Sequence, residues 1–253
     1  MLTECHIVSS TCKALVCKKS SYSAWKTHGI MGKQVGSCKY SVLKSSAVPL
    51  WYLDMSPAPT YEGDNSVLLQ LTAKHLFKGE LGTSPKPGAI VDPNSIESMT
   101  AAAAYVSERE VERVRDSLGK ALESGKDMED IWNEDIQREV IEMSKIWGNY
   151  ILIKSFSQTL DDIQAEHRPF YRKIGLVFCG QLILDIKRLP FYGLKFEPID
   201  DVTAIFSQDE KAVLFDSFDP FAIRDSYTLN SDYLDKKGAK LMSIVHQNLK
   251  ARL

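Results

Sequence analysis

The sequence predicts an all-α protein, a bundle of long antiparallel helices preceded by a poorly structured N-terminal segment. Three observations support this prediction. From Ser95 onward, apolar residues recur at spacings of three and four and do not alternate as in strands. Turn-forming residues gather in short stretches, such as Gly79 to Pro93, and leave long uninterrupted runs between them. The first 50 residues show neither period and carry seven lysines against one acidic residue.

Composition excludes several classes of protein. The chain has 253 residues, of which 44% are hydrophobic and 25% are charged, as in an ordinary globular protein. No apolar run approaches the roughly 20 residues of a membrane-spanning helix, so we expect no membrane span. The lysine pairs at 18–19 and 236–237 are short and isolated. They do not form the extended basic patch that binds nucleic acid, so we expect no nucleic-acid partner.

Cysteine is concentrated in the N-terminal segment, where four of the five cysteines fall within the first 38 residues. Their spacing contains no Cys-x-x-Cys pair, so we predict no metal site and interpret them as unpaired thiols. The segment is rich in Ser and Lys, which leaves a loosely transit-peptide-like alternative open, although it contains no arginine. We therefore expect residues 1–50, called the leader below, to be irregular.

The first helix is predicted over residues 65–78. Pro57 and Pro59 force extended or turn backbone before it, and Asp64 is placed to cap its N-terminus. The stretch from Gly79 to Pro93 contains three prolines and three glycines and is predicted to be a linker. The apolar residues of this helix that can share one face are Val67, Leu68, Leu71 and Leu76.

Three further helices are predicted in the second half. Ser107 to Glu110 reads Ser-Glu-Arg-Glu, a capping box that would open a helix at that point. A long helix should run from about residue 127 to 163. Another should begin at Arg168-Pro169, and because it is apolar on most sides we expect it at the centre of the bundle. Two or three shorter helices would complete the chain.

The stretch most informative about chemistry is Thr60 to Gln70, which reads Thr-Tyr-Glu-Gly-Asp-Asn-Ser-Val-Leu-Leu-Gln. It places the carboxylate of Glu62 on a glycine turn directly before an apolar helix. From the residues alone, Glu62 is either a capping or solvent-facing acid, or a general base. A carboxylate held against a buried substrate can abstract a proton alpha to a thioester carbonyl.

This run resembles the segment of acyl-CoA oxidases that carries their catalytic glutamate. The looser Tyr-Glu-Gly pattern also occurs in acyl-CoA dehydrogenases, and the Asp64-Asn65 pair favours the oxidases, in particular their pristanoyl or branched-chain type. The resemblance implies that Glu62 removes the alpha proton of an acyl-CoA, that FAD accepts the hydride, and that O₂ is reduced to H₂O₂. It also implies, more weakly, that Gly63 and Asn65 bind the cofactor and that Tyr61 contacts the substrate.

The resemblance covers roughly residues 52–253 and implies three regions. These are a leader at 1–50 without family resemblance, a remnant of the flavin-side helical domain at 51–85, and an oxidase-like C-terminal helical domain at 94–253. Family members carry a Cys-Gly-Gly-His-Gly-Tyr-like flavin segment shortly before the glutamate, and residues 36–44 do not match it. Most of the FAD site is therefore expected to be missing.

The final residues Ala251-Arg252-Leu253 are a variant of the Ser-Lys-Leu signal and predict recognition by the peroxisomal import receptor and a location in the peroxisomal matrix. Two functions stay open at this point. One is an acyl-CoA oxidase relative that acts on acyl-CoA and O₂, is expected to be incomplete as a catalyst in this chain, and forms a homodimer or pairs with oxidase subunits. The other is a non-catalytic helical module that pairs with full-length oxidase subunits.

Overall fold

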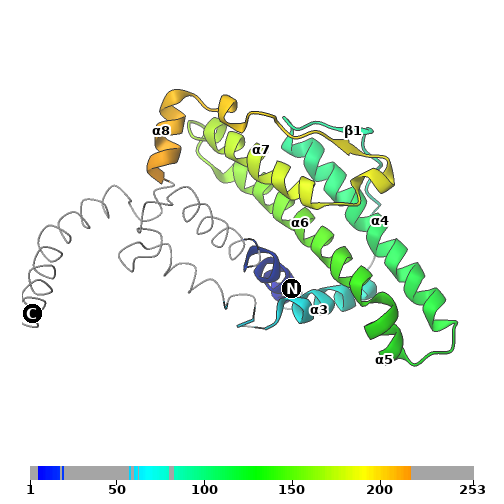
Figure 1. Ribbon diagram of the computed structural model, residues 1–253. Coiled ribbons are helices and arrows are strands. Elements are labelled where there is room, and N and C mark those ends of the chain that lie inside the picture. Colours follow the sequence, from blue (N-terminus) through cyan, green and yellow to red (C-terminus); the bar gives the residue numbers. More distant parts are fainter. Residues whose placement is uncertain are drawn as a thin grey trace, which may run out of the picture. The chain divides into compact units, whose positions relative to one another are not determined.

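The computed structural model describes residues 5–17, 19, 57, 60, 61, 63–79 and 83–217 (Figure 1). The chain divides into two compact units. The first comprises Met1–Thr27 and Tyr52–Val202, and the second comprises His28–Trp51 and Thr203–Leu253. In the second unit, the described part holds helix α8 (Gln208–Ser217) and residues 203–205 of the 3₁₀ turn Val202–Ile205. The other elements discussed below belong to the first unit.

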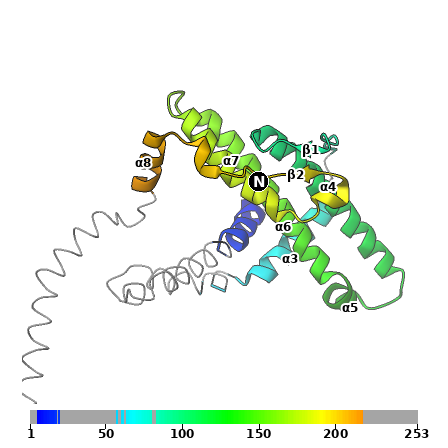
Figure 2. The same cartoon turned by 45° about the horizontal axis from the view of Figure 1, so that its top comes forward.

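Three long helices form the frame of the first unit. They are α4 (Ile96–Leu122), α6 (Gln137–Asp162) and α7 (Arg168–Asp185). Short connections join them, so successive helices run antiparallel and lie side by side (Figure 1, Figure 2). Helix α3 (Asn65–Lys78) packs on α6. The predicted all-α bundle is confirmed, and within the described residues no helix is long and apolar enough to cross a membrane.

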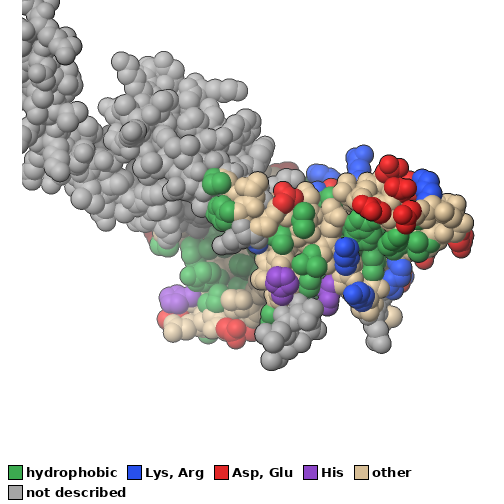
Figure 3. Space-filling model, turned by 90° about the horizontal axis from the view of Figure 1, so that it is seen from below, with side chains coloured by type: hydrophobic (Ala, Val, Ile, Leu, Met, Phe, Trp, Pro, Cys, Tyr) green, Lys and Arg blue, Asp and Glu red, His purple; other side chains and the backbone are tan. Residues whose placement is uncertain are grey.

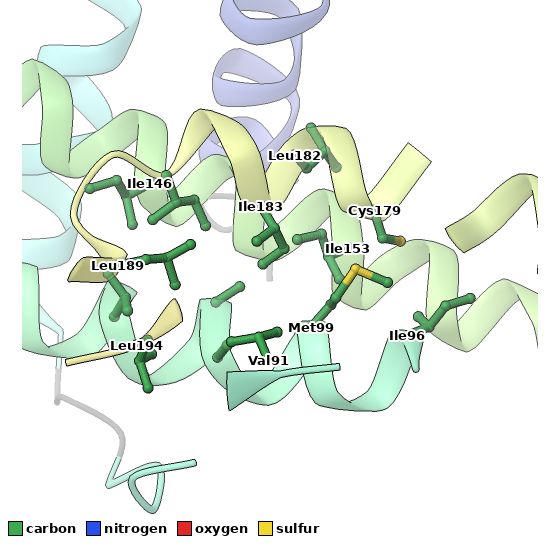
Figure 4. Packing of buried hydrophobic residues seen from close by; sticks show 14 of the residues in the cluster. Val91, Ile96, Met99, Ile146, Ile153, Cys179, Leu182, Ile183, Leu189 and Leu194 are labelled. Carbon is green, nitrogen blue, oxygen red and sulfur yellow. The ribbon is translucent and has the colours of Figure 1, made fainter. Parts of the chain in front are cut away.

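The main core lies between these three helices. Met99 of α4, Ile153 of α6 and Ile183 of α7 are fully buried and meet in the middle of the cluster (Figure 4). Cys179 is buried in the same cluster, and burial raises the pKa of its thiol to about 12, so it is an inert core residue. A second cluster packs α3 against the C-terminal half of α4, the start of α6 and the segment that joins them. It consists of Ala73, Val111, Val114, Ile131, Ile136, Val140 and Met143.

Helix α3 has the bounds that the sequence predicts. Asp64 is its N-cap, and its Oδ1 accepts hydrogen bonds from the backbone N–H groups of Ser66 (2.8 Å) and Val67 (3.3 Å). At the other end, the Arg115 guanidinium donates to the carbonyl oxygens of Leu76, Phe77 and Gly79 at 3.1–3.3 Å. These contacts satisfy the carbonyl groups that a helix end leaves without partners.

The predicted helix start at Ser107 is wrong. Helix α4 begins at Ile96, where Ser95 Oγ accepts a hydrogen bond from the N–H of Ser98 (3.0 Å), and it continues unbroken through residue 107. The alanines at 101–104 favour helix strongly, and the carboxylate of Glu110 does not reach back to a cap. Glu110 is fully buried and is bound by Arg113 (3.0 Å) and by the hydroxyl of Tyr192 (2.9 Å).

The predicted long helix at 127–163 is interrupted near its start. It consists of α5 (Met128–Asp130), a π-helical segment (Ile131–Ile136) and α6. Residues five apart share a face of a π-helix, whereas in an α-helix they point in different directions. The π-helical segment therefore allows Ile131 and Ile136 to be buried together, at 0% and 2% exposure.

A small strand pair lies in two stretches that the sequence predicts to be irregular. Strand β1 (Ile90–Val91) and strand β2 (Lys195–Phe196) pair in parallel, and the N–H of Lys195 donates to the carbonyl of Ala89 (2.8 Å). A short 3₁₀ turn at Leu189–Tyr192 precedes β2. A strand of two residues has no room for alternation, so no sequence pattern could predict it.

The leader is not irregular at residues 5–17, which are helical. Ile7, Ala14 and Leu15 are buried, together with the polar residues Ser10 and Thr11. The buried positions follow a helical period, but small and polar side chains occupy several of them, so an apolar count does not detect it. The segment lies against α3 and α6. The other residues of the leader, apart from Lys19, lie outside the described residues.

The sequence predicts that α7 lies at the centre of the bundle. This prediction is wrong, because α7 lies at one side of the frame. Cys179, Leu182 and Ile183 face the core, whereas Tyr171, Phe178 and Leu184 are 36–43% exposed. Gly175 permits the close approach of α7, because a Cβ atom there would overlap Phe156 of α6 and Ile96 of α4.

Candidate functional site

The candidate site is the turn that precedes α3. The carbonyl of Pro57 accepts hydrogen bonds from the N–H groups of Thr60 (2.9 Å) and Tyr61 (3.1 Å), which fixes the approach to the turn. Gly63 then adopts a left-handed conformation with φ of 106°. Only glycine adopts this conformation at little cost, and a Cβ atom there would press on Leu68. Glu62, the predicted base, is one residue before Gly63 and lies outside the described residues.

Asp64 caps helix α3, which is one of the roles that the sequence leaves open for Glu62. The Asp64 carboxylate caps α3 through the N–H groups of Ser66 and Val67. A helix N-terminus leaves about four N–H groups without intrahelical partners, and Asp64 accepts from those of Ser66 and Val67. Asp64 is therefore the N-cap that the sequence predicts, and the role of Glu62 stays a prediction.

A lysine that sequence reasoning missed binds this turn. Lys13 Nζ donates to the carbonyl of Gly63 (2.6 Å) and to Asn65 Oδ1 (3.0 Å). Asn65 Nδ2 in turn donates to the carbonyl of Ala14 (3.1 Å). The structure thus joins Gly63 and Asn65, two of the predicted site residues, to the helix at 5–17. No sequence signal pointed to Lys13, because the first 50 residues show no apolar period.

The surface near the turn is apolar and open. Tyr61 is 46% exposed, Val67 is 61% exposed and Leu71 is 37% exposed. Val67 and Leu71 are four residues apart and share a face of α3. On the face of the molecule shown in Figure 3, acidic and basic side chains are interspersed. An acyl chain or another protein surface would suit the apolar side chains beside the turn.

Two cavities formed by the described residues lie away from the turn. The larger, of about 850 Å³, lies between α3 and the π-helical segment. There Trp132 Nε1 donates to Gln70 Oε1 (2.8 Å), and Lys74 Nζ lies 5.3 Å from the centre of the Trp132 ring. The other, of about 430 Å³, lies between the end of α7 and β2. Neither is lined by Gly63 or Asn65, so these cavities do not provide a flavin pocket at the turn.

A buried polar cluster centred on Glu110 lies away from the turn and joins two elements of the fold. Glu110 is enclosed by Arg113, Tyr192 and Arg188, and burial together with the bond to Glu110 raises the pKa of the Tyr192 hydroxyl above its usual range. This group joins α4 to the turn at Leu189–Tyr192. No group of His, Cys, Asp or Glu side chains among the described residues could hold a metal ion. The predicted targeting residues Ala251, Arg252 and Leu253 lie outside the described part of the chain.

Two family models match the sequence. The acyl-CoA oxidase C-alpha1 domain matches residues 1–77, and the acyl-CoA oxidase domain matches residues 95–204. Together they cover most of the chain. The first match includes the leader, which we expected to lack family resemblance. That expectation is wrong, and the helix at 5–17 on α6 agrees with the correction.

Curated relatives are similar over part of their length. Peroxisomal acyl-coenzyme A oxidase 1 of Rattus norvegicus is 27% identical over 177 residues, which is 60% of this chain and 27% of the relative. Peroxisomal acyl-coenzyme A oxidase 2 of Mus musculus is 27% identical over 193 residues, which is 66% of this chain and 27% of the relative. The chain thus spans about a quarter of the length of the relatives it matches.

Solved structures share the fold. Acyl-CoA oxidase-1 of Caenorhabditis elegans, complexed with FAD and ATP, aligns with a TM-score of 0.67 and 16% identity over 90% of this chain and 36% of its own. Acyl-CoA oxidase-2 of the same organism, bound with FAD, ascaroside-CoA and ATP, aligns with a TM-score of 0.65 and 18% identity, over 90% of this chain and 35% of its own. Family models, relatives and fold agree: the chain belongs to the acyl-CoA oxidase family.

Proposed function

We propose that the chain takes part in the FAD-dependent α,β-dehydrogenation of acyl-CoA with O₂ reduced to H₂O₂, and that Glu62 is the base that removes the alpha proton. One observation carries the proposal. In a member of the acyl-CoA oxidase family, the turn around Glu62 keeps the left-handed glycine and the capped helix that would hold a single carboxylate in place.

The described residues on either side of Glu62 are bound to other parts of the chain. Before it, Tyr61 is bound to the carbonyl of Pro57, and after it Gly63 is bound to Lys13. The N-terminus of α3 begins three residues later and favours negative charge close to it. A carboxylate placed in this way accepts a proton from a bound thioester, provided that the substrate excludes water.

FAD is the cofactor that we propose, because two solved structures with the same fold contain it. The described residues form only one side of such a site, and the amide of Asn65 is already bound to Lys13 and Ala14. A flavin would therefore be held mainly by protein other than the described residues. The weak cofactor role of Gly63 and Asn65, and the substrate role of Tyr61, stay predictions.

The test is peroxide production by the purified chain with FAD and acyl-CoA. Because most of the FAD site is expected to be missing, we expect the isolated chain to bind FAD poorly and to form little or no peroxide. A flavin absorbance near about 450 nm together with robust peroxide production would overturn this expectation. Glu62→Gln should abolish any turnover that occurs without changing the melting temperature, because it removes the base and keeps the shape. Glu166→Gln, at an exposed residue of the loop before α7, is the matched control. A wild-type chain without flavin or turnover would refute an enzymatic role for this chain alone. A comparison of peroxide production with straight-chain and 2-methyl-branched acyl-CoA would test the predicted pristanoyl type.

A second candidate is a non-catalytic module that pairs with a full-length oxidase subunit. Two exposed apolar side chains that share a face of α7, Tyr171 and Phe178, favour it, because an exposed apolar surface is suited to contact with another protein. Co-elution of the inactive Glu62→Gln chain with a full-length oxidase would support pairing. Loss of co-elution in Phe178→Lys, with no change in melting temperature, would place the interface on α7, and this candidate fails if the two proteins elute separately.

We further propose that the chain is imported into the peroxisomal matrix, since its curated relatives are named peroxisomal oxidases. Ala251, Arg252 and Leu253 provide a small residue, a cation and a leucine for the import receptor. A reporter fused ahead of the last dozen residues should give punctate signal that is lost when Leu253 is deleted. Diffuse signal from the intact tail would contradict the proposal.

A further inference from the structure

We propose that Lys13 is a positioning residue that, together with Asn65, clamps the turn carrying Glu62 onto the helix at 5–17. Its effect on catalysis rests on the function proposed above. The clamp itself rests on contacts between described residues.

The clamp consists of three hydrogen bonds between segments that lie about 50 residues apart in the sequence. Lys13 Nζ donates to the carbonyl of Gly63 (2.6 Å) and to Asn65 Oδ1 (3.0 Å), and Asn65 Nδ2 donates to the carbonyl of Ala14 (3.1 Å). A lysine only donates and a carbonyl only accepts, so these partners fix the orientation of the Asn65 amide. The contacts form a closed ring from Lys13 through Gly63 and Asn65 to Ala14.

The helix that bears Lys13 is itself anchored, so its ammonium is a fixed point. Leu15 and Thr11 pack directly on Gly148 of α6, where a Cβ atom would overlap both side chains. Thr11 Oγ1 and Thr72 Oγ1 share a hydrogen bond of 2.7 Å, which joins the helix to α3. Lys13 is half-buried in this arrangement, unlike an exposed lysine, which loses most of its interaction energy to solvent and side-chain entropy.

The clamp acts at the residue where the turn is least restrained by its own geometry. Glycine populates left-handed and right-handed regions about equally, so Gly63 alone does not hold one conformation. The Lys13 bond to its carbonyl selects one orientation of the peptide between Gly63 and Asp64. A misplacement of about 1 Å can lower a rate by about a hundredfold. A cation that fixes this peptide would therefore affect kcat more than KM.

The decisive experiment measures amide hydrogen exchange in the full chain and needs no activity. Lys13→Met should raise exchange in peptides covering residues 61–68 by about tenfold, as expected when a hydrogen bond to a charged group is lost. Exchange in α4 should stay unchanged. Lys13→Arg should restore protection, because a guanidinium can reach both acceptors.

Thr72→Val is the matched control for loosening the helix without touching the clamp. Thr11 keeps its bond to the carbonyl of Ile7 (2.8 Å), so the variant leaves no buried donor without a partner. It should lower the melting temperature slightly and leave exchange at 61–68 near wild type. Equal exchange in Lys13→Met and Thr72→Val, or no change in Lys13→Met, would overturn the proposal.

Acyl-CoA oxidation provides the second readout. Lys13→Met should lower kcat by between about ten- and a hundredfold with little change in KM, and Lys13→Arg should recover most of it. If wild type forms no peroxide while Lys13→Met still loosens the turn, the proposed function fails and the clamp stands. If kcat is unchanged in an active chain, Lys13 does not position the base.

Discussion

Helix α6 is covered by two neighbourhoods that are built in different ways. On the α4 and α7 side, large aliphatic side chains such as Ile153 and Ile183 are fully buried against one another (Figure 4). On the side of α3 and the helix at 5–17, the second apolar cluster, which includes Val140 and Met143, is joined by small and polar contacts. Gly148 receives Leu15 and Thr11, Thr11 bonds Thr72, and Ser144 Oγ donates to the carbonyl of Leu69 (2.8 Å).

The difference indicates a division of labour within the unit. Aliphatic burial is non-directional and provides most of the stability of a domain. Hydrogen bonds and close glycine contacts add less free energy but fix geometry, because they tolerate little displacement. The turn that carries Glu62 stands on the polar side. We therefore expect the aliphatic side to dominate unfolding and the polar side to dominate the geometry of the site.

Truncation of the aliphatic core should have the largest effect. Ile153→Ala removes a fully buried side chain and should lower the free energy of unfolding by about 2–5 kcal/mol, through lost burial and the cavity left behind. Urea denaturation measures this change. Leu71→Ala, at 37% exposure on α3, is the control and should stay within about 0.5 kcal/mol. Similar losses in both variants would mean that the comparison of the two sides is wrong.

Overpacking the polar side should lower the free energy of unfolding by less than Ile153→Ala does, and its structural effect should be local. Gly148→Ala forces a Cβ atom into Leu15 and Thr11 and should cost about 1–3 kcal/mol. Hydrogen exchange should rise at 5–17 and leave α7 unchanged. Gly119→Ala on α4 has nothing within 4 Å of the added atom and should stabilise by about 0.5–1 kcal/mol. A Gly148→Ala variant as stable as Gly119→Ala would show that the helix at 5–17 does not need this contact.

The cap of α3 should have an intermediate effect. Asp64→Ala leaves the N–H groups of Ser66 and Val67 without their acceptor and should cost about 1 kcal/mol, measured by thermal unfolding. Asp64→Ser retains a capping oxygen and should recover most of the loss. If Asp64→Ser is as unstable as Asp64→Ala, the charge of the aspartate matters more than its hydrogen bonds.

The same contrast explains how much the sequence could predict. Helix α3 was predicted with its cap and both bounds, because Asp64, the apolar stripe and Gly79 are all local signals. The helical class and the three long helices followed from apolar periods. The start of α4 was missed because the sequence from Ser107 to Glu110 matches the pattern of a capping box. In the structure Glu110 caps no helix and instead binds Arg113 and Tyr192.

The site was predictable only in its local part. The Tyr-Glu-Gly turn and the left-handed Gly63 follow from neighbouring residues. Lys13 was not predictable, because its bonds to Gly63 and Asn65 depend on the packing of Leu15 against Gly148, a contact between distant segments. The exposed face of α7 was missed for the same reason, since a helix that is apolar on most sides does not specify which face the bundle covers.

The smallest expected loss of stability comes from removing an ion pair between α4 and α7, on the aliphatic side. Glu97, at the start of α4, accepts from Arg172 of α7 at 2.8 Å. The pKa of the Glu97 carboxyl is held below its usual range. The main cause is the hydrogen bond from its own backbone N–H, and the bonds from Arg172 and Ser95 add to it. A folded-state pKa below the unfolded value means that the stabilisation is present above the unfolded pKa, about 4.3, and is lost as pH falls through the folded pKa.

Glu97→Gln should therefore lower stability by only a few tenths of a kcal/mol at pH 7, because the pair is largely exposed. The difference from wild type should vanish as the pH falls below about 4, near and below the ordinary pKa of a glutamate. Urea denaturation across this range, with Glu166→Gln as the control, measures it. A loss as large as that of Gly148→Ala would contradict the division proposed here, because polar contacts would then stabilise the α4–α7 side as much as they order the side of the turn.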